Sequence, residues 1–193
     1  ASVQGAMERL TRVAVRARGA FPESAETRSI IRLALLSGRG LLRVEDVGLS
    51  QRLDVLRTAI EAGVAEEIAR IDLAMAYLGA GSGWGRAERA AEAVAPLLED
   101  DEDLIAWRAA VLYAESKIAT TNWWMRSPGD DMDIEMVEAN ATAALDALDR
   151  VERRTGREGT FMSPDGEQYD SLLARVKAFL AMNDLGGATL ARD

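Results

Sequence analysis

Apolar residues recur at intervals of three and four positions along almost the whole chain, which is the spacing of one face of an α-helix. In the second expected helix this face consists of Ile30, Ile31, Ala34 and Leu35. Glycine, proline, asparagine or serine residues punctuate the segment ends, as is usual at helix boundaries. The pattern predicts an all-α protein of about eight or nine helices without a substantial sheet. The expected helices span residues 3–18, 24–37, 50–63, 64–78, 86–98, 103–121, 132–154, 167–182 and 187–192.

Two segments between these helices are expected to be irregular. Residues 122–131 contain the helix-breaking sequence Ser127-Pro128-Gly129. Residues 156–166 end in Ser163-Pro164-Asp165-Gly166, which is a strong turn signal. We interpret both segments as connections between helices.

Alanine is abundant on the apolar faces of the expected helices, and small side chains let neighbouring helices approach closely. This composition favours antiparallel hairpins that stack as a short irregular solenoid or as a bundle. We treat residues 1–193 as a single α-helical domain and consider residues 1–19 as a docking helix.

The clearest helix pair in this respect runs from residue 71 to residue 98. Its characteristic positions are Leu73, Ala74, Tyr77, Gly81, Ala87, Ala91 and Val94, and a similar closing unit has Phe179, Asn183, Asp184 and Ala188. The spacing of these positions resembles that of a tetratricopeptide repeat. Trp107 and Tyr113 are placed to open a further unit. The resemblance implies a non-catalytic scaffold that presents a concave groove to a partner peptide or subunit. A bundle without a groove is the alternative.

The amino-acid composition excludes many functions. The chain contains no histidine and no cysteine, so it cannot form a Ser-His-Asp or Cys-His relay, nor a zinc site with nitrogen or sulfur ligands. The formal net charge of −9 argues against binding to nucleic acid, whose phosphates require a basic surface. No apolar run approaches the ~20 residues of a membrane span. We expect no catalytic residue, metal or cofactor.

The predicted function is therefore that of a protein-interaction scaffold or an accessory subunit of a larger assembly. The alternative is a helical bundle that binds a small ligand, or an enzyme that depends on carboxylates, because the 32 acidic residues make some close pairs inevitable. A closed pocket lined by two or more buried acids would favour the alternative.

The first expected helix is amphipathic and rich in arginine. Two interpretations are open: an organellar presequence, or the first packed helix of a protein that was processed after targeting to an organelle or the periplasm. Arg9, Arg12 and Arg16 lie largely on its polar side. Residues 1–70 carry 11 arginines and 9 acids, whereas the remainder carries 12 basic and 23 acidic residues. These arginines are expected to steer the chain towards an acidic protein or an anionic membrane surface, including a membrane-bound complex.

A second candidate surface is the segment Trp123-Trp124-Met125-Arg126. Tryptophan and arginine are enriched among the residues that dominate binding energy at protein interfaces. The same side chains could instead fill the space between the sixth and seventh helices. The sequence leaves partner contact and core packing as two hypotheses.

Three further features have a structural and a functional interpretation. The glycine-rich segment 79–85 is either a connecting loop or a phosphate loop, but it lacks the lysine and hydroxyl residue of the latter. The acidic runs 99–103 and 130–135 either stabilise the starts of helices or hold Ca²⁺. Neither has the glycine of an EF-hand loop, and helix capping is the favoured interpretation.

Overall fold

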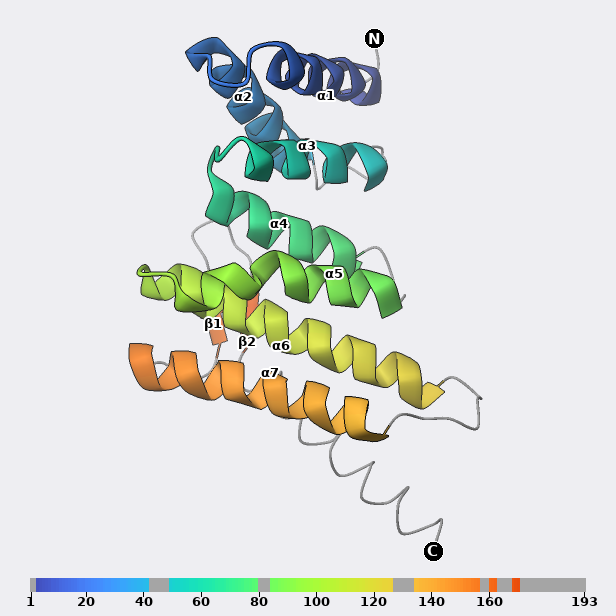
Figure 1. Ribbon diagram of the computed structural model, residues 1–193, viewed down its shortest axis with the longest axis vertical. Helices are drawn as coiled ribbons and strands as arrows, with labels where there is room; N and C mark the ends of the chain where they lie inside the picture. The colour runs from blue at the N-terminus through green and yellow to red at the C-terminus, as the bar shows by residue number, and fades with distance from the viewer. Residues whose placement is uncertain are drawn as a thin grey trace, which may run out of the picture. The chain divides into compact units, whose positions relative to one another are not determined.

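The computed structural model describes residues 3–41, 49–79, 84–126, 134–156, 160–162 and 168–170. Within these residues the chain forms seven α-helices, one short 3-10 helix and one pair of three-residue strands (Figure 1). The all-α fold class predicted from the spacing of apolar residues is confirmed. The α-helices are α1 (Val3–Ala20), α2 (Ala25–Leu41), α3 (Leu49–Glu61), α4 (Glu66–Gly79), α5 (Trp84–Val94), α6 (Asp103–Arg126) and α7 (Ile134–Thr155). The remaining elements are the 3-10 helix η1 (Ala95–Glu99) and the strands β1 (Thr160–Met162) and β2 (Gln168–Asp170).

The chain divides into two compact units, residues 1–76 and 77–193. In the first unit, α1, α2 and α3 pack against one another in all three pairings. Each helix buries a narrow face and exposes a polar one, as expected for amphipathic helices around a shared core. The buried residues of these helices are Thr11, Ala14, Thr27, Ile31, Ala34, Leu35, Val55, Leu56, Thr58 and Ala59. The first helix is therefore an integral part of the core of this unit.

A tight turn joins α3 to α4. The amide of Gly63 donates to the Ile60 carbonyl at 3.0 Å, and the amide of Val64 donates to the Ala59 carbonyl at 3.0 Å. This pair of bonds is the Schellman arrangement, in which the residue after the helix adopts a left-handed conformation. Gly63 has a φ of +60°, and Ala65 has a φ of +47°. The turn thus satisfies the last carbonyls of α3 and reverses the chain into α4.

In the second unit, α6 lies between α5 and α7 and contacts both helices (Figure 1). Its buried residues therefore surround the helix axis instead of forming one stripe, as expected for a central helix. They are Ile105, Ala106, Trp107, Arg108, Ala109, Ala110, Val111, Leu112, Ala114, Ser116, Ile118 and Thr120. The hydroxyl of Ser116 donates to the Leu112 carbonyl at 2.6 Å, so the helix itself satisfies this buried polar group.

The helix α7 presents a regular seam to α6. Five of its six buried residues, namely Val137, Ala141, Ala144, Leu148 and Val151, are separated by four, three, four and three positions, and the sixth is Ala147. This alternation places all five side chains on one face of an α-helix. Two of the five are alanines, which permit the backbones of α6 and α7 to approach closely.

Several expected helix ends differ from the structure. The helix α6 continues through residues 122–126, which were expected to be irregular, because no glycine or proline interrupts it before Ser127. The expected fifth helix ends at Val94 and continues as η1, because Pro96 cannot donate the hydrogen bond of an α-helix interior. The helix α2 extends past Gly38 to Leu41.

The strand pair is a further correction. The strand β1 lies in an expected loop, and β2 lies at the start of an expected helix. The two strands pair in antiparallel register, with Phe161 opposite Tyr169. The predicted turn sequence 163–166 lies between them, so it joins two strands that are too short to show an alternating pattern. The other residues of the two last expected helices lie outside the described residues.

Replacing Gly63 with alanine is expected to lower the free energy of unfolding by about 1 kcal/mol, because a Cβ atom is disfavoured at positive φ. No heavy atom lies within 4 Å of the added Cβ, so the cost is conformational and not steric. Gly19→Ala is the matched control, since the space around Gly19 is also open and the residue lies within α1. Urea denaturation followed by circular dichroism measures both changes. Equal effects of the two substitutions would contradict the assigned turn.

Leu148→Ala is expected to lower the free energy of unfolding by about 3 kcal/mol, through lost burial and the cavity left at the α6–α7 contact. Leu148 is 0% exposed. Leu145, three residues earlier on the same helix, is only partly buried, and its replacement with alanine should cost clearly less. The same denaturation experiment compares the two variants, and a larger loss for Leu145→Ala would show that the seam has been assigned to the wrong face.

Candidate functional site

The arginine residues predicted to steer binding lie on the outer face of α1. Arg9, Arg12 and Arg16 are all exposed, whereas Thr11 and Ala14 are buried on the opposite side of the helix. The spacing of three and four residues between the arginines places them in one row along the helix. We call these three residues the arginine face.

Among the residues that the structure describes, no acidic side chain forms an ion pair with the arginine face. The Nε atom of Arg12 donates to the backbone carbonyl of Glu8 at 3.2 Å. Within the described part of the chain, neither Arg9 nor Arg16 makes a hydrogen bond or an ion pair. Their positive charges are therefore available to an external anion.

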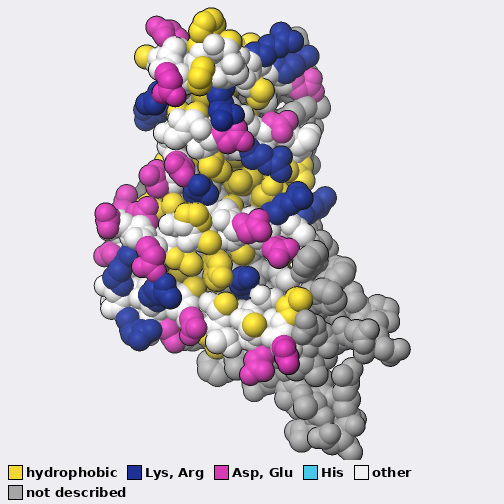
Figure 2. All heavy atoms as spheres, in the orientation of Figure 1, with side chains coloured by type: hydrophobic (Ala, Val, Ile, Leu, Met, Phe, Trp, Pro, Cys, Tyr) yellow, Lys and Arg dark blue, Asp and Glu magenta, His cyan; other side chains and the backbone are white. Residues whose placement is uncertain are grey.

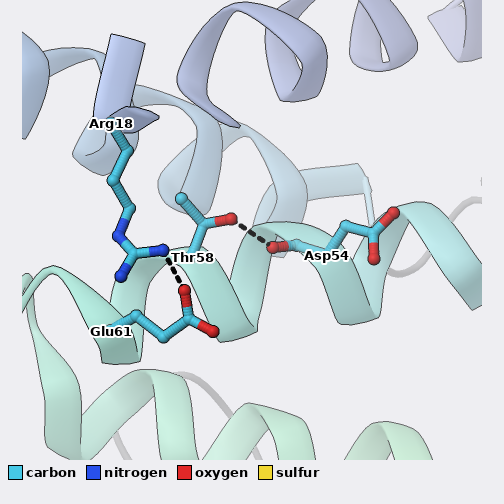
Figure 3. Close-up of polar contacts among 4 residues, drawn as sticks. All are labelled: Arg18, Asp54, Thr58 and Glu61. Atoms are coloured by element: carbon cyan, nitrogen blue, oxygen red, sulfur yellow. Dashed lines mark hydrogen bonds and ion pairs between the residues drawn. The ribbon is translucent and has the colours of Figure 1, made fainter. Parts of the chain in front are cut away.

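Arg18, two residues beyond the arginine face, has a different role. Its guanidinium forms an ion pair with the carboxylate of Glu61 and so links the end of α1 to the end of α3 (Figure 3). Nearby on α3, the hydroxyl of Thr58 donates to the Asp54 carbonyl at 2.6 Å. Both charged partners in the ion pair are substantially exposed, so its contribution to stability is below ~1 kcal/mol.

Exposed apolar side chains accompany the arginines in the first unit. Val13 is 50% exposed and lies between Arg12 and Arg16, and Phe21 is 68% exposed in the turn after α1. Val15 and Leu33 are also exposed. Sequence reasoning missed Val13, Val15 and Leu33, because aliphatic residues within an amphipathic helix are expected to face the core.

A pocket in the first unit was also missed. It has a volume of about 410 Å³ and lies between α2 and the α3–α4 turn. The lining residues are Arg28, Ser29, Arg32, Gly63, Val64 and Ala65. The only sequence signal is the pair of arginines one helical turn apart, since the opposite wall comes from a distant segment.

The backbone of the segment 123–126 forms the end of α6, in the second unit. The side chains of Trp123, Trp124, Met125 and Arg126 lie outside the described residues. The choice between partner contact and core packing thus stays a prediction from the sequence.

Acidic residues of the run 99–103 form ion pairs and a hydrogen bond with other residues of the second unit. Arg150 of α7 pairs with Glu99, and the Nε atom of Arg154 lies 3.3 Å from a carboxylate oxygen of Asp103. The carboxylate of Asp100 accepts a hydrogen bond from the Glu102 amide at 2.9 Å, immediately before α6. These contacts stabilise the start of α6 and connect it to α7. Residues 130–133 of the second run and residues 80–83 of the glycine-rich segment lie outside the described residues.

Chemically reactive groups are few in the part of the chain that the structure describes. It contains no group of three or more acidic side chains placed to hold a metal ion. Burial raises the pKa of the Tyr113 phenol. The Lys117 ammonium lies 5.5 Å from the centre of the Tyr113 ring, one turn along α6. The lining of the pocket beside α2 includes two cationic side chains, Arg28 and Arg32.

Charged side chains of both signs are interspersed over the described residues on the face shown in Figure 2. No described helix combines the length and the apolar character needed to cross a membrane. Comparisons of the chain with models of known protein families, with curated proteins and with solved structures find no match.

Proposed function

We propose that the chain is a non-catalytic helical adaptor, or an accessory subunit, that binds an acidic surface of a partner protein. The observation that carries this proposal is the arginine face of α1. Its members are exposed, and neither Arg9 nor Arg16 has a partner within the described residues. An acidic protein surface supplies the missing counter-charges, and complementary charge increases the rate of association.

The exposed apolar residues add a reason to favour a protein partner. Val13 lies between Arg12 and Arg16 in the sequence and is exposed, so a surface bound to the arginine face would cover apolar area as well as charge. Burial of apolar area is the dominant favourable contribution in most protein association. A purely electrostatic contact with an anionic membrane would not require Val13.

The resemblance to tetratricopeptide repeats is consistent with this role and remains part of the proposal. The described positions that carry it in α4 and α5, namely Leu73, Ala74, Tyr77, Ala87, Ala91 and Val94, are all buried. Gly81 and the closing unit, Phe179 to Ala188, lie outside the described residues.

Charge reversal of Arg12 and Arg16 together is expected to weaken partner association about tenfold at low salt and much less at ~0.5 M salt, because exposed charges are screened. The control is charge reversal of Arg89 and Arg153, which are exposed on α5 and α7 and change the net charge equally. The partner is first recovered by native pull-down with mass spectrometry, and binding is then measured at both salt concentrations. Equal losses in both double variants, or binding only to anionic vesicles, would refute the proposal.

Trp124→Ala is expected to weaken the same association by about 2 kcal/mol at any ionic strength, if the tryptophan anchors the partner by apolar burial. Binding at low and high salt, with circular dichroism of the free variant, measures the effect. Loss of the fold in the free variant would instead assign Trp124 to the core of the second unit.

A further inference from the structure

The pocket beside α2 is an open surface pocket that carries two cationic side chains. Its volume of about 410 Å³ falls within the ~300–1,000 Å³ of typical small-molecule sites. Two arginines, Arg28 and Arg32, line one side. Their separation of four residues places both side chains on the same face of α2. The pocket therefore brings two positive charges to one cavity.

These two charges are poorly compensated. Within the described residues, Arg32 makes no hydrogen bond or ion pair. Arg28 has an ion pair with Glu23, but the Nη2–Oε2 distance is 3.7 Å and the Glu23 side chain is 89% exposed. Like charges one helical turn apart repel each other. An anion between the two guanidinium groups would relieve this repulsion.

The opposite wall is formed by the turn from Gly63 to Ala65. Hydrogen bonds of the Gly63 and Val64 amides to α3 hold the turn in place, and Val64 is buried. Ala65 is a non-glycine residue with a φ of +47°, a conformation that costs free energy. The nearest acid on α4, Glu66, is bound by Arg70 at 2.8 Å. Backbone hydrogen bonds thus hold the wall in place, and the carboxylate of Glu66, the first acid after it, is already paired with Arg70.

We propose that this pocket binds the phosphoryl group of a small phosphorylated molecule through Arg28 and Arg32. A single guanidinium already matches the two oxygens and one charge of a carboxylate. A phosphoryl group has three terminal oxygens and nearly two negative charges, which correspond to two guanidinium groups. The Ser29 hydroxyl donates to the Ala25 carbonyl at 2.9 Å, so the arginines are the donors assigned to the ligand.

This site goes beyond the proposed adaptor function and uses different residues. The arginine face belongs to α1, whereas the pocket belongs to α2 and the α3–α4 turn. The two activities can therefore be separated by single substitutions. Arg32→Gln removes one charge from the pocket, and Arg16→Gln removes one charge from the arginine face of the same unit.

The test is an NMR titration of the full chain with inorganic phosphate and, in parallel, with glycerol 3-phosphate, at constant ionic strength against sodium chloride. Saturable shifts are expected at the Gly63 and Ala65 amides and at the Nε–H groups of Arg28 and Arg32. Arg32→Gln should raise the dissociation constant about tenfold or more, because it removes a charge-assisted contact. Arg16→Gln should change it less than twofold. Circular dichroism verifies that both variants fold.

The two titrants distinguish the source of the phosphoryl group. Tighter binding of glycerol 3-phosphate than of inorganic phosphate would support a small phosphorylated molecule as the ligand of the pocket. Equal or tighter binding of inorganic phosphate would instead identify the free phosphate anion as the ligand. Shifts that do not saturate, that appear equally with chloride, or that weaken equally in Arg16→Gln and Arg32→Gln would overturn the site. If the chain binds its partner but not phosphate, the phosphoryl site is wrong and the adaptor function stands. If the chain binds phosphate but no partner, the adaptor function is wrong and the phosphoryl site stands.

Discussion

Close approach of helices through alanine is the constraint on which both units depend. Alanine occupies the buried face of every α-helix in the described part of the chain. It loses no side-chain entropy on folding and is the strongest helix former, so the same residue favours both the helix and the contact. The spacing of helix axes depends on the side chains between them. Few large residues are then needed to fill each core, and Ile31, Leu35, Trp107 and Leu148 are among the largest that are fully buried.

The helices could be predicted from the sequence because each of them repeats its apolar residues at helical spacing. The ends of the helices were harder to predict, because a proline or glycine near an end does not always terminate the helix. Pro96 converts the end of α5 into a 3-10 turn, whereas Gly38 does not stop α2. The helix α6 is buried on two sides because it lies between α5 and α7. Its apolar residues therefore do not form a single stripe along the sequence. The pattern predicted a helix there but not how many helices surround it.

The arginine face and the pocket also differ in how far the sequence could predict them. Arg12 and Arg16 lie two positions from buried Ala14, and Arg9 lies five positions from it, so all three fall on the opposite face of the helix and local sequence was sufficient to predict their exposure. The pocket joins Arg32 of α2 to the turn at Gly63, and only the packed unit brings these segments together. The left-handed conformation of Ala65 has no signal in the sequence, because alanine is not a typical residue at that conformation. Long-range packing is what the sequence pattern could not supply.

The arginines of the described residues differ in their contacts. Some arginines connect elements of the fold, as Arg18 connects α1 to α3 and Arg150 connects α7 to the segment before α6. Arg16 and Arg32 have no such partner in the described residues, although the chain as a whole carries 32 acids and only 23 basic residues. The lack of a partner for these two arginines is therefore not caused by a shortage of acids in the chain. It follows from the positions of both residues on exposed helix faces. Because residues 1–70 carry 11 arginines against 9 acids, an approaching anion meets these two arginines without a surrounding excess of negative charge. The same anion would be repelled by the remainder of the chain, with its 12 basic and 23 acidic residues. The excess of arginine over acid is thus confined to residues 1–70, which also contain the proposed arginine face and the proposed pocket.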